Sequence, residues 1–313
     1  MSAAAIETSN LGKTYRTFRR DTVPALESVS VRIEPGTIFG LIGQNGAGKT
    51  TLVKILLGLT KPSGGSASVL GGSSRDPKIR QRIGYVPEHM RLPDYFKAES
   101  FLRYMGELNR VGADALRHRI PKLIERVGLG GVDKPVKAYS KGMQQRLGLA
   151  QALVNDPDIL FLDEPTDGLD PLGRKDVRDL LVSLRSEGKT IFLNSHLLSE
   201  IELVCDRIVI LNKGQVARRV TPSECTSGTG EYYLRVGHTD DRVKAAARSV
   251  LGTLESARDW QGRTLRFRPH DVAHLNALID RIRAVPAEIE AVEPIKLTLE
   301  ELFLQVVSGE QVC

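Results

Sequence analysis

The sequence has few cysteines and no long hydrophobic segment. Its 313 residues include three cysteines and no Cys-x-x-Cys pair, which argues against a disulfide framework and favours a reducing cytosol. No run approaches the roughly 18 apolar residues that a membrane-spanning helix needs. The opening residues, MSAAAIETSN, lack the basic and apolar regions of a signal peptide. We therefore expect a cytoplasmic protein that acts on a membrane, if at all, from one side.

Positive charge is concentrated in the first two thirds of the chain. The net charge is +6, but residues 1–220 carry 33 Lys and Arg against 24 Asp and Glu, whereas residues 221–313 carry 11 against 14. A basic domain can serve a nucleotide, an anionic lipid surface or a nucleic acid. Charge alone does not choose between these partners.

The order of predicted elements divides the chain into two domains. Residues 1–222 alternate β-type runs with helical patterns, and from about residue 94 to 153 the pattern is helical and rich in charge. The Ser-, Thr- and Gly-rich residues 223–230 are typical of a linker. Residues 231–313 follow the order β-α-β-β-α-β of a ferredoxin-like domain and end in a helix, TLEELFLQVV. We predict an α/β domain with an inserted helical subdomain, followed by a small α+β domain.

A glycine-rich loop is the strongest motif. Residues 43–50 spell G-x-x-x-x-G-K-[ST], after the predicted strand TIFGLIG and at the start of the predicted helix TTLVKILLGL. In such a loop, backbone N–H groups and the helix N-terminus face phosphate oxygens. Lys49 is predicted to reach the β- and γ-phosphates, and Thr50 to ligate Mg²⁺. The predicted nucleotide-binding residues of this loop are Gly43, Gln44, Asn45, Gly46, Ala47, Gly48, Lys49, Thr50 and Thr51.

Two carboxylates end a second predicted strand. The run DILFLDEP is apolar until Asp163 and Glu164, and α/β sheets bind ligands at the carboxyl ends of their strands. We therefore predict that Asp163 holds Mg²⁺ and that Glu164 is the general base for an attacking water. His196 follows the strand TIFLNS, where a neutral imidazole can donate to a γ-phosphate. Lys49, Glu164 and His196 are the predicted catalytic residues.

With these motifs in place, residues 1–220 resemble the ATP-binding-cassette (ABC) family. Residues 139–146, YSKGMQQR, align with the family signature LSGGQ-x-Q-R. The resemblance implies that Ser140 and Gly142 contact the γ-phosphate bound to an opposite cassette. The run GLDP resembles the family's D-loop, which implies that Asp170 lies across the same interface. Tyr15 stands where the family has an aromatic residue that stacks on adenine.

The sequence departs from the family pattern at two charged positions. Lys141 replaces a glycine of the signature and adds a positive charge that we expect to face a γ-phosphate. Glu88, in IGYVPEHM, stands where the family usually has a glutamine that approaches Mg²⁺ and the attacking water, so we include it in the predicted metal site. Similar variants resemble a bacterial exporter branch that carries drugs, lipids, ions or polysaccharides. Subunits of that branch end in an accessory domain that closes with a segment like LTLEELFLQVV.

The resemblance implies a P-loop NTPase fold, with a RecA-like core, an antiparallel β subdomain and the inserted helical subdomain. It implies an ATPase that uses ATP and Mg²⁺, dimerises with a second copy on ATP, and drives a separate transmembrane permease from the inner face of the membrane. We expect an exporter, and the direction of transport is inferred from the resemblance only.

Three other functions fit the sequence less well. A Ras-like GTPase needs Asn-Lys-x-Asp, and residues 212–215, NKGQ, lack the aspartate. A DNA-acting ABC ATPase needs long coiled-coil arms between its two nucleotide motifs, and the segment between residues 50 and 163 leaves no room for them. A ribosome-acting ABC ATPase usually has two cassettes in one chain, and here there is one. The basic first domain keeps this last alternative open, although we expect no nucleic-acid partner.

Overall fold

The computed structural model describes residues 3–16, 21–226, 230–251, 257–295 and 298–308. Contacts between Cα atoms divide the chain into two units. The first contains residues 1–222 together with the chain from Phe303 onward, and the second contains residues 223–302. In the described part of the chain, no helix has the length and apolar character needed to cross a membrane.

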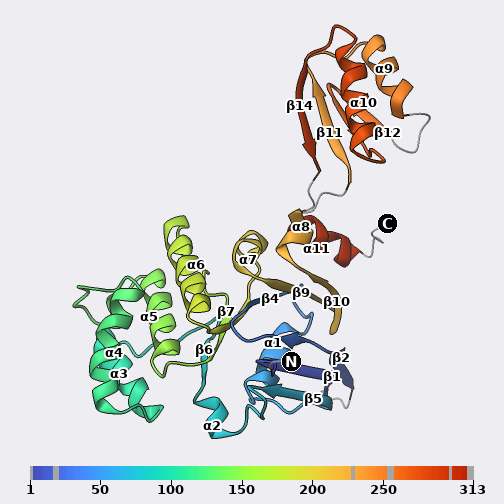
Figure 1. The fold of residues 1–313 in the computed structure, drawn as a ribbon. Helices are drawn as coiled ribbons and strands as arrows, with labels where there is room; N and C mark the ends of the chain where they lie inside the picture. Colours follow the sequence, from blue (N-terminus) through green and yellow to red (C-terminus); the bar gives the residue numbers. More distant parts are fainter. Residues whose placement is uncertain (1–2, 17–20, 227–229, 252–256, 296–297, 309–313) are drawn as a thin grey trace. The chain divides into compact units, whose positions relative to one another are not determined.

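A six-stranded sheet forms the centre of the first unit, with the strand order β10-β9-β4-β8-β7-β6 (Figure 1). Its strands are β4 (Ile38–Ile42), β6 (Ile83–Val86), β7 (Ile159–Asp163), β8 (Thr190–Asn194), β9 (Arg207–Asn212) and β10 (Gln215–Val220). All neighbours are parallel except β9 and β10, which form a hairpin through Lys213 and Gly214. Every residue of β4, β7 and β8 is buried, as expected for parallel strands that are covered on both faces.

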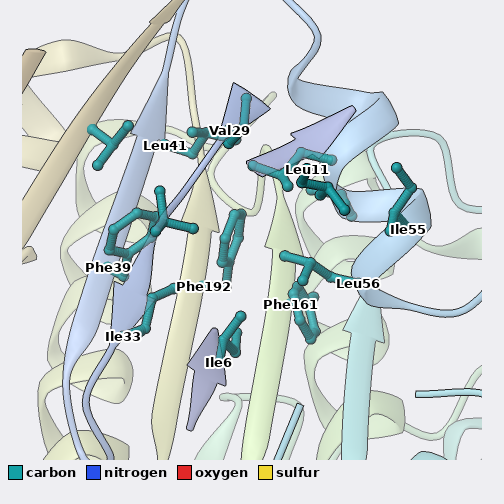
Figure 2. Close-up of a cluster of buried hydrophobic side chains, with 14 of the residues drawn as sticks. Ile6, Leu11, Val29, Ile33, Phe39, Leu41, Ile55, Leu56, Phe161 and Phe192 are labelled. Carbon is teal, nitrogen blue, oxygen red and sulfur yellow. The ribbon is translucent and has the colours of Figure 1, made fainter. Parts of the chain in front are cut away.

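An antiparallel sheet packs against this central sheet. It consists of β1 (Ile6–Arg16), β2 (Thr22–Val29), β3 (Arg32–Ile33) and β5 (Gly64–Val69), and β1 pairs with the other three. Helix α1 (Lys49–Leu56) buries its apolar side in the same core. Figure 2 shows this core, in which Phe161 and Phe192 of the central sheet lie with Ile6 of β1 and Leu56 of α1. The packing anchors the start of α1 beside the carboxyl ends of the central strands.

Helices cover the rest of the first unit. They are α2 (Pro77–Arg80), α3 (Ala98–Leu108), α4 (Ala113–Arg126), a 3₁₀ turn (Val136–Ala138), α5 (Lys141–Leu153), α6 (Pro171–Ser186) and α7 (Leu198–Val204). The short helix α8 (Pro222–Thr226) follows, and its residues from Ser223 onward group with the second unit. Helices α3, α4 and α5 form the predicted inserted subdomain, drawn in green in Figure 1. Phe101 of α3 is almost fully buried in it, and so are Leu116 and Ile120, which lie four residues apart on one face of α4.

The second unit has the predicted order β-α-β-β-α-β. Its elements are β11 (Tyr232–Val236), α9 (Asp241–Leu251), β12 (Ala257–Gln261), β13 (Thr264–Phe267), α10 (Val272–Arg283) and β14 (Ile289–Pro294). The antiparallel sheet has the order β12-β13-β11-β14, and its core includes Leu234, Phe267 and Leu278. The final helix, α11 (Leu299–Ser308), begins in this unit, and its residues from Phe303 onward group with the first unit. From the sequence we assigned all of residues 231–313 to one domain.

Candidate active site

A cavity of about 710 Å³ lies in the first unit, where the central parallel strands end. Its lining includes residues that the sequence predicts: Gly43, Gln44, Asn45, Lys49, Thr50, Glu88, Asp163, Glu164 and His196. It also includes residues that the sequence did not single out: Ile42, Asn194, Ser195, Leu198 and Phe303. Because β4, β6, β7 and β8 run in the same direction, their carboxyl ends bring these distant segments to one edge of the sheet.

At two positions in the loop before α1, the backbone leaves room only for glycine. Gly48 caps α1 at φ 103°, and a Cβ atom there would come within 2.4 Å of the Ala25 carbonyl oxygen. A Cβ atom on Gly43 would come equally close to the carbonyl oxygen of Leu211. The loop therefore closes tightly over the start of α1. The first N–H groups of a helix have no partner within the helix, so this end is suited to bind phosphate.

Lys49 folds back into this loop. Its Nζ donates to the carbonyl oxygens of Gly43, at 2.6 Å, and Gln44, at 3.2 Å. Burial lowers the pKa of the Lys49 ammonium, and the negative charges of Glu164 and Asp163 partly offset that effect. The ammonium thus lies within the loop and within electrostatic range of both carboxylates.

Asp163 and Glu164 are buried at the end of β7, with 6% and 8% of their surface exposed. Burial raises the pKa of both carboxyl groups, because removal from water disfavours the charged form. Hydrogen bonds act in the opposite direction: Asn194 donates to Asp163, and His196 and Ser195 stabilise ionised Glu164. A carboxylate whose pKa is raised toward neutrality is suited to accept a proton.

The backbone of Glu164 is also unusual. Its φ is 53°, in the left-handed region that is rare for residues other than glycine. Two contacts hold this conformation: the Glu164 N–H donates to the Asn194 carbonyl oxygen at 2.8 Å, and Gln145 Nε2 donates to the Glu164 carbonyl oxygen at 3.3 Å. Non-glycine residues in such conformations tend to occur at functional sites.

Three consecutive residues at the end of β8 contact the two carboxylates: Asn194, which is the last residue of the strand, and then Ser195 and His196. Asn194 Nδ2 donates to Asp163 Oδ1 at 2.5 Å. Ser195 Oγ donates to Glu164 Oε2 at 3.1 Å, and His196 Nδ1 lies 2.9 Å from the same oxygen. His196 was predicted, whereas Asn194 and Ser195 were missed. Their position at the carboxyl end of a strand that pairs with β7 was the signal that could have identified them.

Glu88 follows β6 and lines the cavity with about half of its side chain exposed. Its negative charge contributes to the raised pKa of Asp163 and opposes the lowered pKa of Lys49. Glu88 therefore lies within electrostatic range of the site. Its carboxylate also lies 3.8 Å from His89, which is exposed.

The other predicted site residues lie outside the cavity lining. Gly46, Ala47 and Thr51 belong to the loop and the first turn of α1. Tyr15 is on β1, 40% exposed, with the Lys13 ammonium 4.9 Å from its ring centre.

Ser140, Gly142 and Asp170 lie at the starts of two helices. Ser140 Oγ caps α5 by accepting from the Met143 N–H at 3.3 Å, and Gly142 follows in the first turn of α5. Asp170 Oδ1 caps α6 by accepting from the Gly173 N–H at 2.8 Å. None of the three lines the cavity of its own chain.

Lys141 pairs with a neighbour in its own chain. Its Nζ lies 2.6 Å from Asp167 Oδ2, and this contact lowers the pKa of Asp167. We expected the Lys141 ammonium to face a γ-phosphate. In the single chain its charge is instead balanced by Asp167, which lies before α6.

The oxygen atoms of the cavity fit a Mg²⁺ ion. In the described part of the chain, no three His, Cys, Asp or Glu side chains gather closely enough to hold a metal by themselves. Mg²⁺ is commonly held by one or two protein oxygens together with phosphates and water. The Thr50 hydroxyl and the Asp163 carboxylate supply such oxygens, and Asn194 Oδ1 is a buried oxygen without a hydrogen-bond partner. Thr50 and Asp163 would hold the ion.

Comparison with known proteins decides the family. The family model described as "ABC transporter" matches residues 26–167. An uncharacterized ABC transporter ATP-binding protein of Synechocystis sp. is 38% identical over 97% of this chain and 85% of its own length. The chain belongs to the ABC transporter ATP-binding proteins. A Nod factor export ATP-binding protein of Cupriavidus metallidurans is 35% identical over 88% of this chain and 93% of its own.

Solved structures agree with this assignment. An ATP-binding cassette solved as a dimer in a post-hydrolysis state, bound to ADP and Pi, matches with a TM-score of 0.64 and 26% identity. The match covers 69% of this chain and 98% of that cassette. The first unit of this ABC protein therefore has the predicted P-loop NTPase fold, and the family assignment supports ATP as its ligand.

Proposed function

We propose that this cassette hydrolyses ATP and so drives export through a separate membrane permease. The observation that carries the proposal is the convergence of a phosphate-binding loop with Lys49, Asp163, Glu164 and His196 on one cavity. A loop alone would support binding. Hydrolysis also needs a ligand for the metal ion and a base for the attacking water, and the buried carboxylates of Asp163 and Glu164 supply them.

The residues of the cavity divide the chemistry between them. The loop amides and Lys49 bind the phosphates of ATP. Mg²⁺, when bound, neutralises charge on the β- and γ-phosphates. Glu164 orients the attacking water and accepts its proton as the water attacks the γ-phosphorus, the bond to the β,γ-bridging oxygen breaks, and ADP leaves. His196 is 64% exposed at its side chain, and it turns from Glu164 to donate to the γ-phosphate.

The family signature needs a second cassette. Ser140 and Gly142 begin helix α5, whose N-terminal end favours an anion, yet they lie outside the cavity of their own chain. A second copy would bring them to the γ-phosphate, and Asp170 would lie at the same interface. The dimeric cassette with ADP and Pi supports this arrangement. We therefore propose an ATP-dependent homodimer.

The names of the relatives support a membrane partner. Their names describe ABC transporter subunits, and one is a Nod factor export protein. The described part of this chain has no helix suited to cross a membrane. We propose that a separate permease carries the pathway, with the cassette bound to its cytoplasmic face.

Two measurements test this proposal. Phosphate release by the purified full chain with MgATP should exceed that of Lys49→Ala, and equal rates would contradict hydrolysis at this site. The tagged chain should also be purified from native membranes in mild detergent. A co-purifying protein with several membrane spans supports transport. Recovery of ribosomal RNA without such a protein would contradict it and favour the ribosomal alternative.

A further inference from the structure

Strands β7 and β8 are parallel neighbours, and Asp163 pairs with Asn194 in their register. The residues at the two strand ends therefore lie side by side. Asn194 is 4% exposed and Ser195 is 3% exposed. A buried amide or hydroxyl costs free energy unless it is hydrogen-bonded, and both of these side chains bond to a carboxylate of the site.

Asn194 fixes the metal-site carboxylate. A carboxylate can only accept hydrogen bonds, so the NH₂ end of the Asn194 amide must be the end that faces Asp163. This contact occupies Asp163 Oδ1, and no described residue donates to Oδ2. It also leaves Asn194 Oδ1 without a partner. The amide thus sets the direction of the Asp163 carboxylate and leaves one oxygen for a cation.

Ser195 fixes the other carboxylate. Its Oγ accepts from the Leu197 N–H at 3.1 Å, so its single proton is directed to Glu164 Oε2. His196 shares that oxygen but is exposed, and in the proposed mechanism it turns to the γ-phosphate. The buried hydroxyl of Ser195 stays in contact with Glu164 when His196 moves.

We propose that Asn194 and Ser195 are positioning residues that give the two adjacent carboxylates different tasks. Asn194 orients Asp163 to bind the divalent cation, and Ser195 orients Glu164 to act on water. This inference rests on the proposed ATPase function. It predicts different effects for substitutions at the two residues. Loss of the Asn194 amide weakens cation binding, and loss of the Ser195 hydroxyl slows turnover.

The cation arm uses the full chain with ATP and Mn²⁺ in place of Mg²⁺. Binding is measured from the electron paramagnetic resonance signal of free Mn²⁺, which does not depend on turnover. Asn194→Ser should weaken Mn²⁺ binding by about tenfold, as expected when one oriented hydrogen bond to a charged group is lost. Ser195→Ala should leave Mn²⁺ binding within about twofold of wild type.

The turnover arm measures phosphate release at saturating MgATP. Ser195→Ala should lower kcat about tenfold with little change in KM, whereas Ser195→Thr, which keeps the hydroxyl, should restore it. Thr190→Val is a matched control. It removes a buried hydroxyl that bonds the Gly36 N–H at the opposite end of β8, so kcat should not change. Thermal unfolding checks that each variant folds.

The outcomes separate this inference from the proposed function. Wild-type kcat in Ser195→Ala, or wild-type Mn²⁺ binding in Asn194→Ser, overturns the inference. So does an equal loss of both properties in both variants, which would indicate general damage to the site. If the wild type releases no phosphate above Lys49→Ala, the ATPase proposal fails, and the Mn²⁺ titration still tests Asn194.

Discussion

Replacement of Glu164 by glutamine tests the proposed base with the smallest change of shape. Glu164 is buried, and Ser195 and His196 hold one of its oxygens. Glutamine has the same length, and its side-chain oxygen can still accept from Ser195. It cannot accept a proton from water, and it removes a charge that burial disfavours. The fold should therefore be retained while hydrolysis is lost.

The expected loss is large. A positioned base contributes roughly 10²–10⁴-fold, and Lys49 and the phosphate loop are unchanged, so kcat should fall by about 10²–10³-fold. This corresponds to about 3–4 kcal/mol in the activation barrier. Because ATP still binds, the ATP-bound state should accumulate. Size-exclusion chromatography with MgATP should then show a dimer of Glu164→Gln.

A Glu→Gln change elsewhere provides the control. Glu187 lies at the end of α6, where it pairs with Arg126 outside the cavity. Glu187→Gln should keep the wild-type kcat and elution volume. Hydrolysis by Glu164→Gln within about threefold of wild type would refute its role as base. Elution of that variant as a monomer with MgATP would refute the ATP-dependent dimer.

Three further substitutions test other parts of the site. Lys49→Ala should weaken ATP binding by about tenfold or more in a fluorescence titration, because the loop loses its ammonium, and an unchanged affinity would contradict the phosphate role. Glu88→Gln should leave hydrolysis largely intact but shift the Mg²⁺ concentration at half-maximal rate, and an identical Mg²⁺ curve would make Glu88 an ordinary surface acid. Gly48→Ala should lower the free energy of unfolding in urea by about 1–3 kcal/mol, because its Cβ would clash with a backbone carbonyl. Gly46→Ala, whose Cβ would meet nothing within 4 Å, should cost less, and equal losses would rule out the clash as the cause.

Local patterns predicted much of the fold because they follow from local physical chemistry. Lys213 and Gly214 both have positive φ, and such a pair suits the tight turn of a hairpin. The order of elements in the second unit was also readable from periodicity alone. Pairing between distant segments was not readable. Strand β1 pairs with β5, more than forty residues later in the chain, and no local signal specifies that register.

The same distinction applies to the site. The loop around Lys49 and the acidic end of β7 were recognisable, because each places its chemical groups within a few consecutive residues. Ser195 was not recognisable, because a buried serine acquires its role from the strand next to it. Phe303 was missed for a similar reason, since only the fold brings α11 to the cavity.

The position of Phe303 changes how the second unit should be regarded. The chain leaves the first unit at residue 222 and rejoins it at Phe303, which lines the nucleotide cavity. In topological terms, the second unit is an insertion near the end of a cassette, and both of its ends are joined to that cassette. Exchange of this unit between relatives would therefore require two splice points with α11 retained. Deletion of everything after residue 222 would remove part of the cavity wall as well.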